Sequence, residues 1–186
     1  MSAPGALHPG LVLLADPALV DPHFEEAAVL LCAHDDQQGS LGLILNRPLD
    51  LPVGQLLPQA GELATARHGL SWGGPVAIEK LHALHGGATG MAECFSVCPG
   101  VEFGGVLEEL TRVHAAHLPV RFFLGYTGWD SGQLDGELAS GTWRLHPGGA
   151  QAAFDPEPDT LWGRLVGSLE PSLRWLQHRP QDPGCN

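Results

Sequence analysis

The sequence predicts a single domain of the α+β class. The chain has 186 residues, a length that suits one compact domain and is short for two. Hydrophobic residues make up 44% of the chain and include five tryptophans, so a folded core is expected rather than disorder. Short apolar runs bounded by turn residues outnumber the segments with apolar residues at helical spacing. We therefore expect one strand-rich domain over 1–186, ordered from about residue 8 to about residue 178, with a frayed tail beyond it.

The N-terminal half predicts three strands before any helix. Residues 11–15 form a short apolar run that ends at an Asp-Pro break. Residues 27–33 and 41–45 flank a polar loop with a terminal glycine, which is the pattern of a hairpin. Both runs are apolar at nearly every position, so we expect these two strands to be covered on both faces. Residues 53–57 then predict a short helix, and residues 59–69 predict a mobile loop.

The C-terminal half mixes strands with two longer helices. The clearest helix is residues 105–117, where Val106, Leu110 and Val113 recur at helical spacing. Aligned leucines predict a second helix at residues 160–169. The remaining apolar runs predict strands at residues 70–76, 81–85, 94–97, 120–124 and 142–146.

A glycine turn and a helix are predicted directly after the strand at 120–124, over residues 125–137. The sequence of this segment is Gly-Tyr-Thr-Gly-Trp-Asp-Ser-Gly-Gln-Leu-Asp-Gly-Glu. Asp130 and Gln133 have the spacing of a helix-capping pair. Such a segment is either a tight joint in which Trp129 fills the core, or a nest of backbone N–H groups for an anion or polar ligand. We favour the joint, because the Lys and Ser/Thr of a nucleotide P-loop are missing after the last glycine.

Several short motifs occur together in a characteristic order. They are Asp21-Pro22-x-Phe24, His34-Asp35, Gly42-Leu43-Ile44-Leu45-Asn46-Arg47-Pro48, Trp72-Gly73-Gly74-Pro75-Val76, Leu84-His85, and Gly125-Tyr126-Thr127-Gly128-Trp129 with Gly132-Gln133-Leu134 and Glu137. In this order the chain resembles the bacterial YqgE/AlgH family, from about residue 10 to about residue 169. It departs from the family pattern at Asp130-Ser131, where a glycine-proline type turn is usual, and at Gly136, where a helix former is common.

The resemblance implies a fold more firmly than it implies a function. It implies a single α+β domain of mixed and antiparallel sheets, with a small closed barrel surrounded by helices. The molecular function of the family is unestablished, and its description as a transcriptional regulator comes from a regulatory phenotype of one member. The two departures are expected to loosen the first turn of the helix after Trp129.

The candidate binding residues all lie in five of these motifs. Asn46 and Arg47 either fasten a turn or hold a carboxylate or phosphate, and the sequence leaves both interpretations open. Gln133 and Glu137 share one face of the predicted helix and either face a cleft or solvate the helix. The full candidate set is His34, Asn46, Arg47, Gly73, Gly74, His85, Gly128, Trp129, Gln133 and Glu137.

The histidines and cysteines do not form a metal-binding pattern. On a strand, His82 and His85 would point to opposite faces, while His114 and His117 supply only two ligands. No HExxH motif or paired CxxC is present, so we expect no metal and no cofactor. Cys94 is either a reactive thiol near His85 or an inert buried cysteine. All four cysteines are expected to be free, namely Cys32, Cys94, Cys98 and Cys185.

The net charge of the chain limits the kinds of partner that it can bind. The chain has 21 acidic and nine basic residues, for a formal net charge of −12, and its arginines are scattered. This balance disfavours direct binding to duplex DNA. No segment predicts a membrane span or a secretory signal, so we expect a cytoplasmic protein.

Two functions from different classes fit these observations. The first is a binding or regulatory protein that acts on gene expression indirectly, through an unidentified small ligand or protein partner. The alternative is a small-molecule enzyme in which His34, His85 or Glu137 is the acid or base and Asn46 or the N–H groups of residues 125–137 stabilise charge. The enzyme requires His34, Asn46, His85, Trp129 and Glu137 to converge on one pocket.

Overall fold

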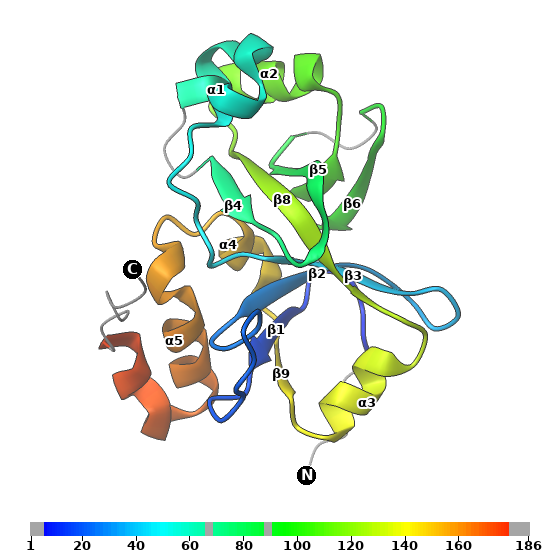
Figure 1. The fold of residues 1–186 in the computed structure, drawn as a ribbon, viewed down its shortest axis with the longest axis vertical. Helices are drawn as coiled ribbons and strands as arrows, with labels where there is room; N and C mark the ends of the chain where they lie inside the picture. Colours follow the sequence, from blue (N-terminus) through cyan, green and yellow to red (C-terminus); the bar gives the residue numbers. More distant parts are fainter. Residues whose placement is uncertain (1–5, 66–68, 88–90, 179–186) are drawn as a thin grey trace.

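The structure is a computed structural model that describes residues 6–65, 69–87 and 91–178 (Figure 1). Its strands are β1 Val12–Ala15, β2 Ala28–Asp35, β3 Gly39–Ile44, β4 Leu70–Trp72, β5 Val76–His85, β6 Cys94–Cys98, β7 Val101–Gly104, β8 Val120–Trp129 and β9 Trp143–His146. Its α-helices are α1 Val53–Leu56, α2 Leu107–Ala115, α3 Gln133–Ala139, α4 Gly149–Ala153 and α5 Pro158–Leu169. Two 3-10 segments are η1 Pro58–Thr65 and η2 Pro171–His178.

The nine strands of the described chain form one large, mostly antiparallel sheet in a domain that mixes helices and strands. The order is β6-β7-β5-β8-β3-β2-β1-β9, and β4 lies off this path, parallel to β8. Every neighbouring pair on the path is antiparallel. The expected closed barrel is therefore wrong. Closure would require the two end strands to pair, and in the described residues β6 pairs with β7 and β9 with β1, in different parts of the molecule (Figure 1).

Strand β8 joins the two parts of the sheet. Its first half pairs with β5 and β4, while Thr127, Gly128 and Trp129 pair with β3. The expected turn after residue 124 is wrong, because the strand continues through Gly125, which has a φ of +67°. Glycine allows that angle within a strand, so here it marks a change of direction rather than an end.

The hairpin of β2 and β3 lies at the centre of the fold, as expected from its continuous apolar runs. Ala28 to Cys32 are all fully buried, as are Leu43, Ile44 and Leu45. Helix α5 with η2 covers one side of these strands, and α3 lies near the other (Figure 1). The two-sided burial of the hairpin is thus confirmed.

A third apolar cluster lies under α2 and η1, on the part of the sheet built by β5 and β8. Ala60 and Leu63 of η1 are buried there, so the expected mobile loop at residues 59–69 is wrong over η1. Residues 66–68 and the tail from 179 to 186 lie outside the described residues. The predicted helices at 105–117 and 160–169 are confirmed as α2 and α5. None of the helices in the described ranges has the length and apolarity that crossing a membrane requires.

Candidate functional site

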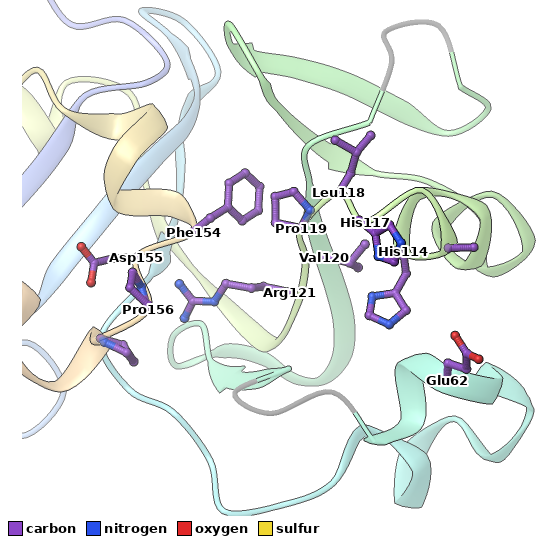
Figure 2. A pocket seen from close by; sticks show the side chains of 12 residues that line it. Glu62, His114, His117, Leu118, Pro119, Val120, Arg121, Phe154, Asp155 and Pro156 are labelled. Carbon is purple, nitrogen blue, oxygen red and sulfur yellow. The ribbon is translucent and has the colours of Figure 1, made fainter.

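A cavity of about 710 Å³ opens between the C-terminal end of α2, the start of β8 and the connection from α4 to α5 (Figure 2). We call it the Arg121 cavity. Its polar lining residues are Glu62, His114, His117, Arg121 and Asp155. Its other lining residues are mostly apolar, and they are Ala115, Leu118, Pro119, Val120, Phe154, Pro156 and Pro158. In Figure 2 the Arg121 side chain extends toward Asp155 and Pro156.

Arg121 is held in one orientation by the fold. Its side chain comes from β8, is 7% exposed, and places the guanidinium 5.0 Å from the centre of the Phe123 ring. Nη1 donates to the Ala153 carbonyl at 2.9 Å, and Nη2 donates to the Leu45 carbonyl at 2.8 Å and to Ser71 Oγ at 3.0 Å. A guanidinium has five N–H donors, so two have no hydrogen bond within the described residues.

The charge of Arg121 has no ion-pair partner among the described residues. The carboxylate of Asp155 acts on this charge, but its Oδ1 already accepts from Arg164 Nη2 at 2.6 Å and from the Glu157 N–H at 2.9 Å. Burial lowers the pKa of Arg121 to about 10, with Asp155 acting in the opposite direction, so the guanidinium stays charged at neutral pH. The wall of the cavity therefore carries a buried cation whose charge is only partly compensated.

The residues predicted from the sequence lie in several separate places. His34, Gly128 and Trp129 line a second cavity of about 530 Å³ beside the β2–β3 hairpin, which we call the hairpin cavity. Asn46 and Arg47 line a small cavity of about 180 Å³ near α5. The five residues His34, Asn46, His85, Trp129 and Glu137 do not converge on one cavity in the described structure. His34 and Trp129 share a cavity that Asn46 and His85 do not line.

Asn46 and Arg47 fasten the chain before β2. Asn46 Oδ1 accepts from the Ala28 N–H, and its Nδ2 donates to the Glu26 carbonyl, both at 2.8 Å. Arg47 donates to the carbonyls of Asn46 and Glu25. Burial lowers the pKa of Arg47, while the nearby carboxylates of Glu26 and Glu25 raise it. The turn interpretation thus accounts for these contacts of the pair, and a ligand role for Arg47 stays a prediction.

Gly73 and Gly74 bring two stretches of backbone into close approach. A Cβ on Gly73 would lie 2.3 Å from the Gly125 carbonyl oxygen, and one on Gly74 would lie 2.4 Å from the Tyr126 backbone. No side chain fits at such distances. These glycines therefore allow the β4–β5 connection to lie against the bend in β8.

Glu137 and Gln133 connect α3 to the strands. Glu137 Oε2 accepts from the indoles of Trp129 and Trp143, while Oε1 accepts from Gln133 Nε2 at 2.8 Å. Gln133 Oε1 in turn accepts from the Asp130 N–H at 3.0 Å. Only this half of the predicted capping pair forms, because the N-cap residue of α3 is Gly132, which has no side chain to cap the helix.

His85 is fully buried under α2. Its Nδ1 accepts from the Gly87 N–H at 3.1 Å, and its Nε2 has no hydrogen-bond partner among the residues that the structure describes. Burial lowers the pKa of His85, and Glu102 and Glu109 oppose that shift. Burial and the same two carboxylates raise the pKa of the Cys94 thiol, which disfavours a reactive thiolate. In the described ranges no group of three or more His, Cys, Asp or Glu residues could hold a metal ion.

Reading the sequence alone missed Arg121. The available signal was a single arginine inside the apolar run Val120-Arg121-Phe122-Phe123. An arginine in such a run is buried only if the fold supplies acceptors for it, so it indicates a special environment.

Comparisons with known proteins agree with this fold along nearly the whole chain. The AlgH-like family model matches residues 12–174. A UPF0301 protein of Chlorobaculum tepidum is 34% identical over 184 residues, covering 97% of this chain and 96% of the relative. A UPF0301 protein of Streptomyces coelicolor is 34% identical over 186 residues, covering 95% and 94%.

Two solved structures have a similar fold. The solution structure of the AlgH protein from Pseudomonas aeruginosa matches with a TM-score of 0.72 and 26% identity, over 98% of each chain. A crystal structure of a protein from Corynebacterium diphtheriae matches with a TM-score of 0.79 and 21% identity, over 95% of this chain and 94% of the other. The chain therefore belongs to the AlgH-like family, as its motifs indicated.

Proposed function

We propose that this protein binds a small anionic ligand in the Arg121 cavity and is a cytoplasmic regulatory protein that acts on gene expression indirectly. The observation that carries the proposal is the Arg121 guanidinium, buried at the cavity wall with no ion pair in the described residues. A buried charge is costly unless a counter-charge or hydrogen bonds compensate it. Three hydrogen bonds compensate part of that cost, and an anion in the cavity would compensate more.

The chemistry of the lining indicates the ligand class. The donors of Arg121 that have no acceptor in the described chain are Nε–H and one N–H of Nη1, and a donor on a charged guanidinium favours a carboxylate or phosphate oxygen as its acceptor. Phe154, Leu118 and Pro119 offer apolar surface for the rest of the molecule. A volume of about 710 Å³ lies within the usual range for small-ligand pockets. We therefore propose a carboxylate or phosphate monoester with an apolar body.

The regulatory part of the proposal rests on charge and on family membership. A net charge of −12 opposes contact with DNA phosphates, so a regulatory effect would pass through the ligand or a protein partner. The described cysteines Cys32, Cys94 and Cys98 are free thiols, which fits a reducing compartment such as the cytoplasm. Of the residues predicted for the enzyme alternative, His34 is the one that contacts a hydroxyl of the described chain, Ser40 Oγ, at the edge of a cavity.

Binding is tested with phenyl phosphate and benzoate as anionic probes and benzamide as the uncharged control, by isothermal titration calorimetry. We expect both anions to bind and benzamide to bind about tenfold more weakly or not at all, because it lacks the charge. Arg121→Gln should weaken phenyl phosphate binding by about tenfold or more. Arg112→Gln is the matched control, because Arg112 is an exposed arginine of α2 and does not line the cavity.

A second variant separates loss of binding from loss of the fold. Ala115 is exposed and lines the cavity without contacting the Arg121 hydrogen bonds, so Ala115→Trp should fill the cavity and leave the melting temperature nearly unchanged. It should abolish binding of phenyl phosphate. Equal affinity for the anions and benzamide, or unchanged binding in Ala115→Trp, would overturn the proposal.

A further inference from the structure

A serine, a histidine and an aspartate are connected in series on the β2–β3 hairpin. Ser40 and His34 face each other in the ladder, with Ser40 Oγ 2.8 Å from His34 Nδ1. The other ring nitrogen, Nε2, lies 3.3 Å from Asp36 Oδ1. A carboxylate can only accept, so Asp36 holds a proton on Nε2 and leaves the Nδ1 lone pair toward the hydroxyl. In the neutral imidazole this tautomer lets Ser40 Oγ donate to Nδ1, which is the arrangement that a general base requires.

This arrangement borders the hairpin cavity, about 530 Å³ in volume. The His34 side chain is 11% exposed, so it is largely shielded from water. Leu41, Val76 and Tyr126 provide an apolar wall, whereas Asp35 and Asp130 add negative charge at the same cavity. Such a lining favours an uncharged or cationic molecule over an anion.

We propose that Ser40 is a nucleophile activated by His34, and that the hairpin cavity hydrolyses small uncharged or cationic esters. Ser40 Oγ bonds to the ester carbonyl carbon while its proton passes to His34 Nδ1. The bond from that carbon to the alcohol oxygen then breaks, and the alcohol leaves with the proton from Nδ1. Water, deprotonated by the same nitrogen, attacks the acyl-serine, which releases the carboxylic acid and restores the hydroxyl.

The remaining requirement is a donor for the negative charge that develops on the carbonyl oxygen. The Gln38 amide and the Tyr126 hydroxyl come from residues on the cavity wall, and neither side chain donates a hydrogen bond within the described chain. Side chains of these types stabilise such oxyanions in other acyl-transfer sites. Asp36 does not touch the substrate in this scheme and is a positioning residue for His34.

The proposal is independent of ligand binding at Arg121, because the two cavities share no lining residue and favour opposite charges. The test uses diisopropyl fluorophosphate, a neutral reagent for activated serines, with intact-mass analysis and peptide mapping. We expect one adduct, at Ser40, and none in Ser40→Ala. Ser96→Ala is the control, because Ser96 is an exposed serine of β6 with no hydrogen bond to a histidine in the described chain, and this variant should react like the parent.

His34→Gln separates catalysis from structure. Glutamine can still hydrogen-bond to Ser40 but cannot take up its proton, so the labelling rate constant should fall about 100-fold or more. Asp36→Asn should slow labelling, since it removes the carboxylate that accepts from Nε2, and Asp36→Glu should restore most of the rate. Hydrolysis of 4-nitrophenyl acetate should fall in parallel in Ser40→Ala and His34→Gln. No adduct, an adduct on another serine, or an unchanged rate in His34→Gln would overturn the proposal.

Discussion

Trp129 and Glu137 are joined by a hydrogen bond of 2.9 Å from the indole Nε1 to the carboxylate Oε2. The same oxygen accepts from Nε1 of Trp143 at 2.7 Å. The two indoles are 5% and 4% exposed and meet edge to face, with ring centres 6.0 Å apart. One side chain of α3 therefore satisfies the polar atoms of two core tryptophans and fastens the helix to β8 and β9.

Replacing Trp129 should destabilise the fold strongly. The ring is almost entirely buried in the cluster around Leu31, Ile44 and Leu134, so Trp129→Ala should lower the free energy of unfolding by about 3 kcal/mol or more. Trp129→Phe retains much of the apolar area and loses the N–H, so it should cost less than the alanine variant. Urea denaturation of both variants measures this order. A nearly neutral Trp129→Ala would show that this segment is not a structural joint.

Glu137 should contribute more stability than its neighbour Gln133. Glu137→Ala leaves two buried indole N–H donors without an acceptor, which should cost about 2 kcal/mol. Gln133 is exposed, so Gln133→Ala should cost about 1 kcal/mol or less. The same denaturation series compares them. If the Glu137 variant unfolds like the parent while a ligand or cellular phenotype is lost, the carboxylate has a functional role instead.

Two glycine-to-alanine substitutions should change the free energy of unfolding in opposite directions. Gly73→Ala would place a methyl group 2.3 Å from the Gly125 carbonyl oxygen, so the β4–β5 connection must move and the protein should lose several kcal/mol of stability, roughly as for other severe steric changes. Gly136 lies inside α3 with open space around it, so Gly136→Ala should stabilise by about 0.5–1 kcal/mol. Thermal unfolding of both variants tests the pair. A tolerated Gly73→Ala would contradict the close backbone approach.

Arg144 should make stability depend on pH in the acidic range. Its Nη2 lies 2.9 Å from Asp16 Oδ2, and its Nη1 lies 2.6 Å from Glu170 Oε2. Burial alone would raise the pKa of Asp16, but hydrogen bonds from the Ala18 N–H and Arg144 outweigh it and lower the pKa. Hydrogen bonds from Arg144 and Ser172 likewise lower the pKa of Glu170.

A carboxyl group whose pKa is lowered by folding stabilises the fold above its unfolded pKa, and that stability is lost as the pH falls through the folded pKa. We therefore expect Arg144→Met to lose less stability than the parent when the pH falls from about 5 to about 2. Arg112→Met is the control, because its partner Glu108 is exposed and on the same helix. Parallel pH profiles of the parent and Arg144→Met, measured by urea denaturation, would contradict this assignment.

Direct DNA binding is not expected. With nine basic residues against 21 acidic ones, the chain cannot neutralise enough phosphates to bind random duplex at physiological salt. Fluorescence anisotropy with a labelled duplex should show no binding at micromolar protein. Salt-dependent micromolar affinity would instead reveal a local basic surface and a direct route to gene expression.

The sequence predicted the elements whose signals are local. The β2–β3 hairpin and helices α2 and α5 follow from apolar periodicity and turn residues within each segment. Residues 125–129 were misread as a turn because glycine usually interrupts strands, whereas here the β8 backbone bends and continues. The closed barrel, implied by family resemblance, depended on the pairing of distant strands, which no local pattern specifies.

The sequence by itself determined the family, the order of most elements and the acidic character of the chain, because each of these is a property of neighbouring residues or of composition. Only the tertiary structure decided which polar groups meet. Arg121 reaches carbonyls of Leu45 and Ala153, 76 and 32 positions away along the chain. Its burial beside a cavity results from packing β8 against α4 and the end of β3. Long-range contacts of this kind depend on how buried surfaces fit together, and residue type and spacing do not encode that fit locally.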